Sequence, residues 1–381
     1  MLRATNIHRG KIVRESLMRA DPSDVPWDRC PPLVDGEILV VRSGAYTGDS
    51  AIVTAEWEGA APGYDLRVTP RRVDPRFLAY VMLSTPALDY FTECRSRAAQ
   101  PHLNADQVAG LRIPEMERHA QAVVADLLDT ETARIDALVS ARMRQRQLIA
   151  ERAAVAVDSL MARAPRITAR RVFSRIDQGW SAVAEASSAT EPGEVGVLRL
   201  DAVSAGAFFP SRNKRIDVAA LRDDWRRFVV SDGDLLLARA SGSRERVGES
   251  ALVELAGEGP TLLFPDILYR LTPGERLSAA FAAAAMRSSD VRAQIREVAR
   301  GTANSKIRSS DLRELQIPLP DPRRQAEIVA VVRRIDATSG ATIAAIDKQI
   351  ALLHERRQAL ITAAVTGRLQ VPGAPLANAV A

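Results

Sequence analysis

The polar side chains best suited to bind nucleic acid are concentrated in two loop regions of each half of the chain. Arginine, amide and hydroxyl groups on loops are the ones that reach base edges in the major groove, while phosphate contacts position a protein on the duplex. The side chains of this kind, which could contact the bases or phosphates of a nucleic acid, are Arg42, Ser43, Tyr46, Thr47, Gln100 and His102, and Arg239, Ser241, Ser243, Arg244, Arg246, Thr302, Asn304, Ser305 and Lys306.

Several of these candidates occupy matching places in the two halves. Gln100 and Asn304 are 204 residues apart, and so are His102 and Lys306. Another interpretation stays open for Arg42 and Arg239, which each follow an apolar run. Either arginine could be structural, pairing with backbone or acidic groups at a strand end.

The motifs of several enzyme classes are absent from the sequence. It contains no G-x-x-x-x-G-K-[ST] or G-x-G-x-x-G phosphate loop and no H-E-x-x-H or C-x-x-C metal motif. The four histidines are scattered, and no lysine has an acidic residue two positions before it. We therefore predict a chain without catalytic residues, cofactor or metal.

The candidate loops belong to a tandem repeat that runs through the whole sequence. Gly36-Glu37-Ile38-Leu39-Val40-Val41-Arg42 aligns with Gly233-Asp234-Leu235-Leu236-Leu237-Ala238-Arg239 at an offset of 197. Ile113-Pro114 aligns with Ile317-Pro318 at an offset of 204. The aligned segments keep their order, so we interpret the chain as two copies of one unit.

Each copy is predicted to combine short buried strands with one long helix. Residues 37–41 and 234–238 are apolar runs opened by Asp-Gly turns. Residues 115–164 contain no Gly or Pro, and residues 323–366 contain only Gly340, which predicts two long helices. The fold class expected is α+β, with two tandem globular domains separated by two long helices.

Apolar residues spaced as in a coiled coil indicate how the helices pack. We predict pairing through Leu128, Ile135, Leu138, Ile149, Ile343, Ile346, Ile350, Leu353 and Leu360, with Arg357 filling a gap in the second seam. Helices of about 40 residues are roughly 60 Å long, which favours pairing with each other. The alternative is that each helix packs on its own globular domain.

Composition sets broad limits on function. The net charge is +5 and the pI is near 9.5, a weak indication of a polyanionic partner. All but four of the 52 basic residues are arginine, which suits phosphate and guanine contacts or merely reflects GC-rich coding. No apolar run has the length of a membrane span, and two cysteines make no disulfide framework, so a cytoplasmic protein is expected.

The motifs together resemble the DNA specificity subunit of type I restriction–modification systems. The resemblance rests on "GEILVVRSGAYTGDSAIV", "GDLLLARASGSRERVGESALV", "SSDLRELQIPLPDPRRQAEIVAVVRRID" and "QIALLHERRQALITAAVTGRL". It implies two target recognition domains, each reading half of a bipartite DNA target, and an antiparallel coiled coil that spaces them. It also implies partners in defence against foreign DNA: two adenine methyltransferase subunits and restriction/translocase subunits, which would bind the cofactors.

The resemblance also implies a domain layout. The first recognition domain would span 1–114, its helix 115–164, the second domain 165–319, its helix 320–371, and a flexible tail 372–381. The sequence departs from the family at its start, because Met1 aligns with Val197 and nothing corresponds to residues 166–196. We expect an incomplete first domain, and a truncated or orphan DNA-binding protein is the alternative function. A coiled-coil scaffold that does not read DNA is a further alternative, although the arginine-bearing loops count against it.

Overall fold

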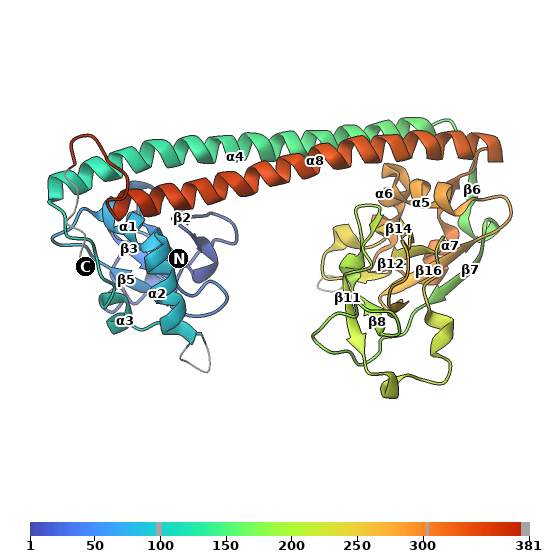
Figure 1. Ribbon diagram of the computed structural model, residues 1–381, viewed down its shortest axis with the longest axis horizontal. Coiled ribbons are helices and arrows are strands. Elements are labelled where there is room, and N and C mark those ends of the chain that lie inside the picture. Colours follow the sequence, from blue (N-terminus) through green and yellow to red (C-terminus); the bar gives the residue numbers. More distant parts are fainter. Residues whose placement is uncertain (97–100, 302–304, 375–381) are drawn as a thin grey trace. The chain divides into compact units, whose positions relative to one another are not determined.

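The computed structural model describes residues 1–96, 101–301 and 305–374 and divides into two compact units (Figure 1). Unit 1 comprises Met1–Gln145 and Ala345–Ala381, and unit 2 comprises Arg146–Ala344. Two helices of 44 residues, α4 (Arg118–Met161) and α8 (Pro322–Val365), each contribute to both units. The two long helices predicted from the sequence are therefore confirmed.

Unit 1 is built around a three-stranded antiparallel sheet in the order β4–β3–β5. Its elements are β1 (Ile7–His8), β2 (Lys11–Ile12), β3 (Ile38–Val40), β4 (Ser50–Ile52), β5 (Leu66–Val68), α1 (Pro75–Leu83), α2 (Thr85–Ser96) and α3 (Ala105–Ala109). Successive side chains of a strand point to opposite faces. Ile38 and Val40 accordingly pack with α1 and α2, while Leu39 packs with Leu2 and Ile7 on the other face.

Unit 2 contains a four-stranded sheet in the order β14–β12–β16–β7 and a three-stranded sheet in the order β11–β8–β15. The larger sheet consists of β7 (Phe173–Gln178), β12 (Leu235–Ala238), β14 (Ser250–Leu252) and β16 (Leu268–Pro273). The smaller sheet consists of β8 (Val195–Leu198), β11 (Asn213–Ile216) and β15 (Thr261–Leu263). Short pairs are β6 (Arg166–Thr168) with β18 (Gln316–Pro318), β9 (Val203–Ser204) with β10 (Ala207–Phe208), and β13 (Ala240–Ser241) with β17 (Ser305–Lys306).

Three helices complete unit 2 and cover one face of its larger sheet (Figure 1). They are α5 (Ala279–Arg287), α6 (Ser289–Val298) and α7 (Ser309–Glu314). Leu235 and Leu237 of β12 face α5 and the two long helices, whereas Leu236 lies in a second core with Phe228 and Phe264. The alternation matches that of β3 in unit 1, as the repeat predicts.

Equivalent glutamines fasten each long helix to its unit. Gln121 is 6% exposed; its Oε1 accepts from the Asp74 N–H at 2.8 Å, and its Nε2 donates to the Met116 carbonyl. Gln325 is 2% exposed, and its Oε1 accepts from the Ser278 N–H at 2.9 Å. Each glutamine ties the first turn of the long helix to the start of a packed helix. The sequence repeat is thus a repeat of structure.

The units differ at one side of the sheet. In unit 2, β7 pairs with β16, and β6 pairs with β18. In unit 1, no strand among the described residues pairs with the outer side of β5 or with residues 112–114. Unit 1 therefore presents an unpaired sheet edge where unit 2 has a covered one.

The buried face of α4 in unit 1 corrects one predicted seam residue. Leu128 and Ile135 are buried as expected, but Leu138 is 47% exposed and Val139 is 8% exposed. Six of the buried positions, Gln121, Ala125, Leu128, Thr132, Ile135 and Val139, alternate spacings of four and three, and Ala120 and Val124 lie beside them. Because Gln121 and Thr132 are polar, the pattern of apolar residues in the sequence did not reveal this spacing. Leu138 lies one position before the buried residue Val139.

The other predicted seam residues lie at half-buried or buried positions of their own units. Within unit 1, Ile346 is 4% exposed, and Ile350, Leu353 and Leu360 are half-buried. Within unit 2, Ile149 and Ile343 are half-buried. Arg357 of unit 1 fills its gap by forming an ion pair with Asp136 at 3.4 Å, and Lys11 binds the same carboxylate at 2.7 Å.

Candidate nucleic-acid interface

The backbone joins the two predicted DNA-binding loop regions in each unit. In unit 1, Ser43 pairs with His102, and the Leu103 N–H donates to the Arg42 carbonyl at 2.9 Å. In unit 2, Ala240 pairs with Lys306, and the Ile307 N–H donates to the Arg239 carbonyl at 3.0 Å. The paired residues of unit 1 align with those of unit 2 in the sequence repeat. The same backbone pairing of two loops, which we call the loop frame, therefore presents different side chains in the two units.

In unit 1 the frame carries a cation between polar aromatic rings. The Arg42 Nε lies 3.4 Å from Nε2 of His102, and its guanidinium lies 4.7 Å from the Tyr64 ring centroid. Tyr64 is 73% exposed, which makes it available to a ligand although the sequence did not single it out. Burial raises the pKa of the neighbouring Asp65, whose carboxylate accepts from the Arg42 N–H at 3.2 Å.

Tyr46 and Ser43 extend the exposed surface of this loop. Tyr46 is 43% exposed and packs edge-on against the His8 ring, with centroids 5.1 Å apart. The exposed ring offers a face on which a base or sugar could stack. Neither residue is buried by its own unit, so both remain candidates for DNA contact.

Three predicted contact residues use their hydroxyl groups to form the loops. Thr47 Oγ1 donates to the Gly44 carbonyl at 2.7 Å, and Ser305 Oγ donates to the Gly301 carbonyl at 2.9 Å. Ser241 Oγ accepts from the Ser243 N–H at 3.1 Å. Thr47, Ser241 and Ser305 are 3%, 5% and 2% exposed, so in this structure they shape the loops and do not face solvent.

An arginine from a helix also holds the turn after the central strand in place in each unit. In unit 1, Arg95 from α2 donates to the Thr47 carbonyl at 3.0 Å. In unit 2, Arg292 from α6 donates to the Val247 carbonyl at 2.7 Å, and burial lowers the pKa of its guanidinium. The turn that follows the central strand is therefore fixed to a helix in both units.

Arg239 and Arg246 are tied to their own unit. Arg239 Nε donates to the Tyr269 hydroxyl at 3.0 Å, and its NH1 donates to the Asp266 carbonyl at 3.3 Å. Arg246 lies 3.5 Å from Glu249 in an ion pair. These contacts favour the structural interpretation of Arg239. Arg42 is half-buried as Arg239 is, but its guanidinium lies beside the exposed Tyr64 ring.

Unit 2 carries a cationic surface beside the Lys306 strand, the unit 2 basic surface. It consists of Arg244, Arg296, Arg300, Lys306 and Arg308. Arg300 and Lys306 exchange two main-chain hydrogen bonds of 2.9 and 2.8 Å, and Arg244 donates to the Arg296 carbonyl at 2.8 Å. Within the described part of the chain, none of the five has an acidic side-chain partner.

Sequence reasoning identified only Arg244 and Lys306 of this surface. Arg300 and Arg308 flank the "GTANSK" loop, and that proximity was the signal that could have included them. Arg296 comes from α6 and reaches the surface through tertiary packing. Gln100, Thr302 and Asn304 lie outside the described residues.

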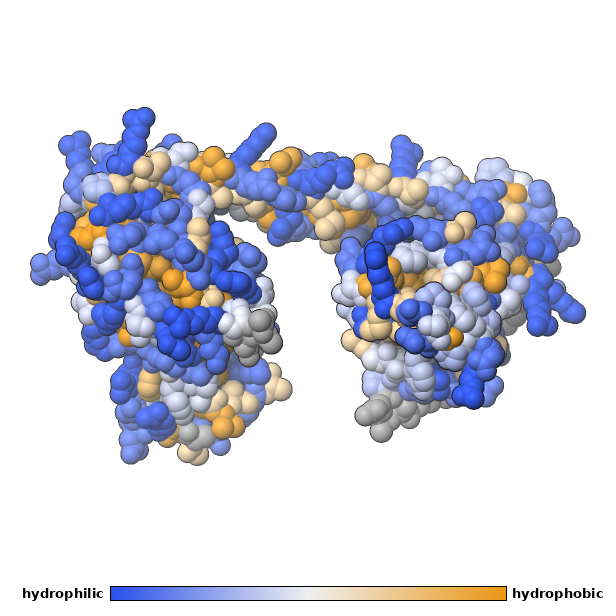
Figure 2. All heavy atoms as spheres, turned by 180° about the vertical axis from the view of Figure 1, so that it is seen from behind, coloured by the Kyte–Doolittle hydropathy of each residue, from blue (hydrophilic) through white to orange (hydrophobic). Residues whose placement is uncertain are grey.

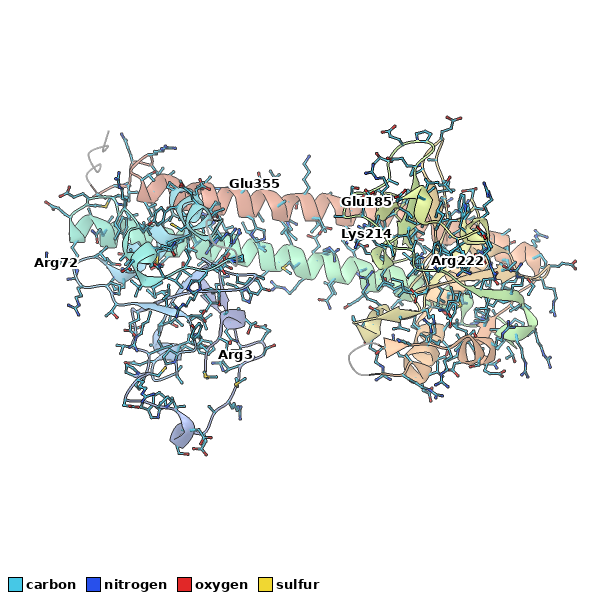
Figure 3. All side chains as sticks on the ribbon, turned by 90° about the horizontal axis from the view of Figure 1, so that it is seen from below. Arg3, Arg72, Glu185, Lys214, Arg222 and Glu355 are labelled. Atoms are coloured by element: carbon cyan, nitrogen blue, oxygen red, sulfur yellow. The ribbon has the colours of Figure 1, made fainter. Side chains whose placement is uncertain are left out.

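A second group of arginines in unit 2 stacks on aromatic rings. Arg222 lies 5.5 Å from the Trp180 ring, Arg226 lies 4.8 Å from Trp225, and Arg227 lies 5.2 Å from Phe228. Arg222 and Lys214 are labelled in Figure 3. Lys214 is exposed on β11. These residues add cationic groups near the smaller sheet that sequence reasoning did not include.

Metal-binding clusters and membrane-crossing helices are both absent from the residues that the structure describes. No group of three or more His, Cys, Asp or Glu side chains is arranged to hold a metal ion. None of the described helices combines the length and apolarity that crossing a membrane would need. The face of the molecule shown in Figure 2 is predominantly hydrophilic, with apolar residues in small patches.

Comparisons with known proteins show which proteins this chain is similar to. No family model matches the sequence. The chain is 24% identical over 392 residues to the Type I restriction enzyme EcoKI specificity subunit of Escherichia coli (strain K12), covering 97% of this chain and 82% of that protein. The expected resemblance to type I specificity subunits is therefore confirmed.

One solved structure shows the same fold. A chain from a structural study of complex assembly and conformational transition of the type I R-M system matches with a TM-score of 0.61 and 18% identity. The match covers 89% of this chain and 83% of that one. The HsdS subunit from Thermoanaerobacter tengcongensis matches with a TM-score of 0.42 and 18% identity, over 96% and 90% of the two chains.

Proposed function

We propose that this chain is the DNA sequence-specificity subunit of a type I restriction–modification complex. The observation that carries the proposal is the repeated loop frame, in which Ser43 pairs with His102 in unit 1 and Ala240 pairs with Lys306 in unit 2. Two similar frames with different side chains suit the reading of two unlike half-sites. The chain itself is non-catalytic.

The reading surface combines phosphate and base contacts. The unit 2 basic surface would neutralise phosphates, because four of its five cations are exposed, Arg296 being half-buried, and none has an acidic partner in the described structure. Ser43, Tyr46 and Arg42 of unit 1, and Ser243 of unit 2, would read base edges. Gln100, Thr302 and Asn304 retain the roles predicted from the sequence.

The long helices would form an antiparallel coiled coil that sets the spacing between the half-sites. Support comes from contacts within each unit. In unit 1, α4 residue Leu128 shares a core with α8 residue Ile361, and the later α4 residue Asp136 pairs with the earlier α8 residue Arg357. In unit 2, Met161 near the end of α4 shares a core with Ile328 near the start of α8.

The proposed partners are double-stranded DNA, two adenine methyltransferase subunits and restriction/translocase subunits, in the cytoplasm. Sequencing of N6-methyladenine in the genome, with and without this gene, tests the role directly. Loss of one bipartite motif upon deletion is the expected result. Unchanged methylation in a strain that expresses the complete complex would refute the proposal.

A second experiment tests whether the length of the two long helices sets the spacing between the half-sites. Inserting seven residues into both α4 and α8 preserves the seam phase and lengthens the pair by about 10 Å, or about three base pairs. The methylated motif should then keep both half-sites and gain about three base pairs of gap. Methylation at the original spacing would contradict the proposal that helix length sets the gap between the half-sites.

A further inference from the structure

An open apolar groove crosses the surface of unit 1 along residues 111–114. Two cavities of about 270 and 290 Å³ flank this segment and share Leu111 in their walls. Ala87 and Val365 line the first, and Val68, Leu78 and Ile113 line the second. We call this feature the unit 1 groove.

The equivalent place in unit 2 is filled by residues 166–178. Strand β6 pairs with β18, and β7 pairs with β16. Two further main-chain bonds anchor the segment, from the Ala169 N–H to the Leu315 carbonyl and from the Leu319 N–H to the Pro165 carbonyl, both 2.8 Å. The repeat therefore shows what this kind of groove binds: an extended strand–turn–strand segment.

Exposure of equivalent residues indicates that none of the residues described by the structure covers the unit 1 groove. Ile113 is 42% exposed, whereas its counterpart Ile317 is 0% exposed under β6. Val68 of β5 is half-buried, whereas its counterpart Leu271 is 2% exposed beside β7. Covering an exposed isoleucine next to an apolar cavity removes apolar surface from water, which stabilises the complex with the ligand.

The backbone of the groove is also free to pair. Residues 112–115 make no main-chain hydrogen bond to any other residue that the structure describes. In unit 2 the corresponding stretch is hydrogen-bonded to β6. Unpaired strand-like backbone beside an apolar surface is the geometry that accepts an added strand.

Charge distinguishes the expected ligand from the segment in unit 2. There, Arg166 pairs with Asp290, and Arg170 pairs with Glu314 at 2.9 Å. At an offset of 204, unit 1 has Pro86 and Gly110 in place of the two acids.

Besides the loss of these two acids, unit 1 has an additional positive charge at the groove. Arg112 occupies the place of Gln316, which lies opposite Thr168 of β6, and Arg112 is exposed. The unit 1 groove has therefore lost the two acids that pair with the basic segment of unit 2. It has gained the base Arg112 and, at the end of the segment, the acid Glu115 in place of Leu319, so the balance of charge still favours an acidic ligand over a basic one.

We propose that the unit 1 groove binds an extended, acidic segment of a partner protein. One strand of that segment pairs with residues 112–114, a second pairs with the free side of β5, and its carboxylates lie beside Arg112. The site is independent of the DNA-binding loops, since Ile113 and Arg112 belong to neither.

Two 13-residue peptides test the proposal with the full chain. One has the sequence of residues 166–178, and the other carries Arg166→Glu and Arg170→Glu. We expect the acidic peptide to bind saturably by fluorescence anisotropy, about tenfold more tightly than the basic peptide. Bound acidic peptide should slow amide hydrogen exchange at residues 111–113 and 66–68.

Variants locate the site and its charge preference. Ile113→Asp should weaken the acidic peptide at least tenfold, whereas Val183→Asp in unit 2, where the native side chain is 85% exposed, should leave binding unchanged. Arg112→Glu should reverse the preference between the peptides. Damage to the apolar lining of the groove would weaken both peptides and would not reverse the preference between them. Circular dichroism checks that each variant folds.

Four results would overturn the proposal. The first is no saturable binding of either peptide, and the second is equal affinity for both. The third is a dimer in which residues 111–113 are protected, which would make a second copy the occupant. The fourth is protection of these amides in the free chain that disappears when residues 375–381 are removed, which would make the chain's own end the occupant.

Discussion

Lys306 offers the most direct test of the proposed DNA contact. Its side chain is exposed in the unit 2 basic surface between Arg300 and Arg308, and it has no acidic partner among the described residues. Its strand is held by main-chain pairing with Ala240 and Arg300. Replacement of Lys306 by alanine should therefore remove one charge and leave the loop in place.

The expected magnitude follows from counterion release. Each neutralised phosphate contributes about 0.9 to the slope of log Kobs against log salt concentration. Lys306→Ala should lower the magnitude of that slope by about 0.9, and the double variant with Arg300→Ala by about 1.8. Between 50 and 200 mM salt, the parent chain should lose about 3.5-fold more affinity than Lys306→Ala.

The assay is fluorescence anisotropy of a labelled random-sequence duplex with the full chain at several salt concentrations. Arg323→Ala is the matched control, because it also removes one positive charge. The Arg323 side chain is 92% exposed at the start of α8 and lies 3.5 Å from Glu327. An unchanged slope for Lys306→Ala, or an equal decrease for Arg323→Ala, would refute a local phosphate contact.

Three further predictions concern stability. Gln325→Leu removes three hydrogen bonds and leaves the Ser278 amide and two carbonyls without their partner, so unit 2 should lose about 3 kcal/mol in urea unfolding at about 1 kcal/mol per bond; a loss below about 1 kcal/mol would contradict this accounting. Burial acts to raise the pKa of Glu37, but hydrogen bonds led by that from Arg67 outweigh it and lower the pKa. The carboxylate therefore stabilises unit 1 above its ordinary pKa of about 4.3, and this contribution is lost as the pH falls through the lower folded value. Glu37→Gln should flatten the loss of thermal stability between about pH 5 and pH 3, and an unaltered pH profile would exclude this role. Ile317→Asp should unfold unit 2 because the side chain is fully buried, whereas Ile113→Asp should change the melting temperature little; similar losses would show that Ile113 is covered in solution.

The sequence predicted the local elements well because local patterns determine them. A stretch of 44 residues without helix-breaking residues formed α4, and the single Gly340 did not interrupt α8. The apolar run at residues 235–238 became a strand buried on both faces. The matched order of motifs revealed the repeat, since both copies must satisfy the same packing constraints.

Register and exposure were less accessible, because they depend on partners distant in the sequence. Leu138 resembled a seam residue by composition, but Thr132 sits in the seam and shifts the next buried position to Val139. The hydroxyl groups of Thr47 and Ser305 resembled ligand contacts, yet both are used inside their loops. No periodicity distinguishes a polar group that faces solvent from one bonded to its own backbone.

The tertiary structure alone brought the functional surfaces together. Arg244 meets the Arg296 carbonyl only because a loop distant from α6 in the sequence folds against its end, and Arg300 pairs with Lys306 beyond that end. Ile113 and Ile317 are the same residue in the same motif, and the sequence predicts the same burial for both. Ile317 is covered and Ile113 is open because a strand from elsewhere in the chain pairs over one and not the other. A residue's own type sets its preference for burial, but only the segment folded over it decides whether that preference is met.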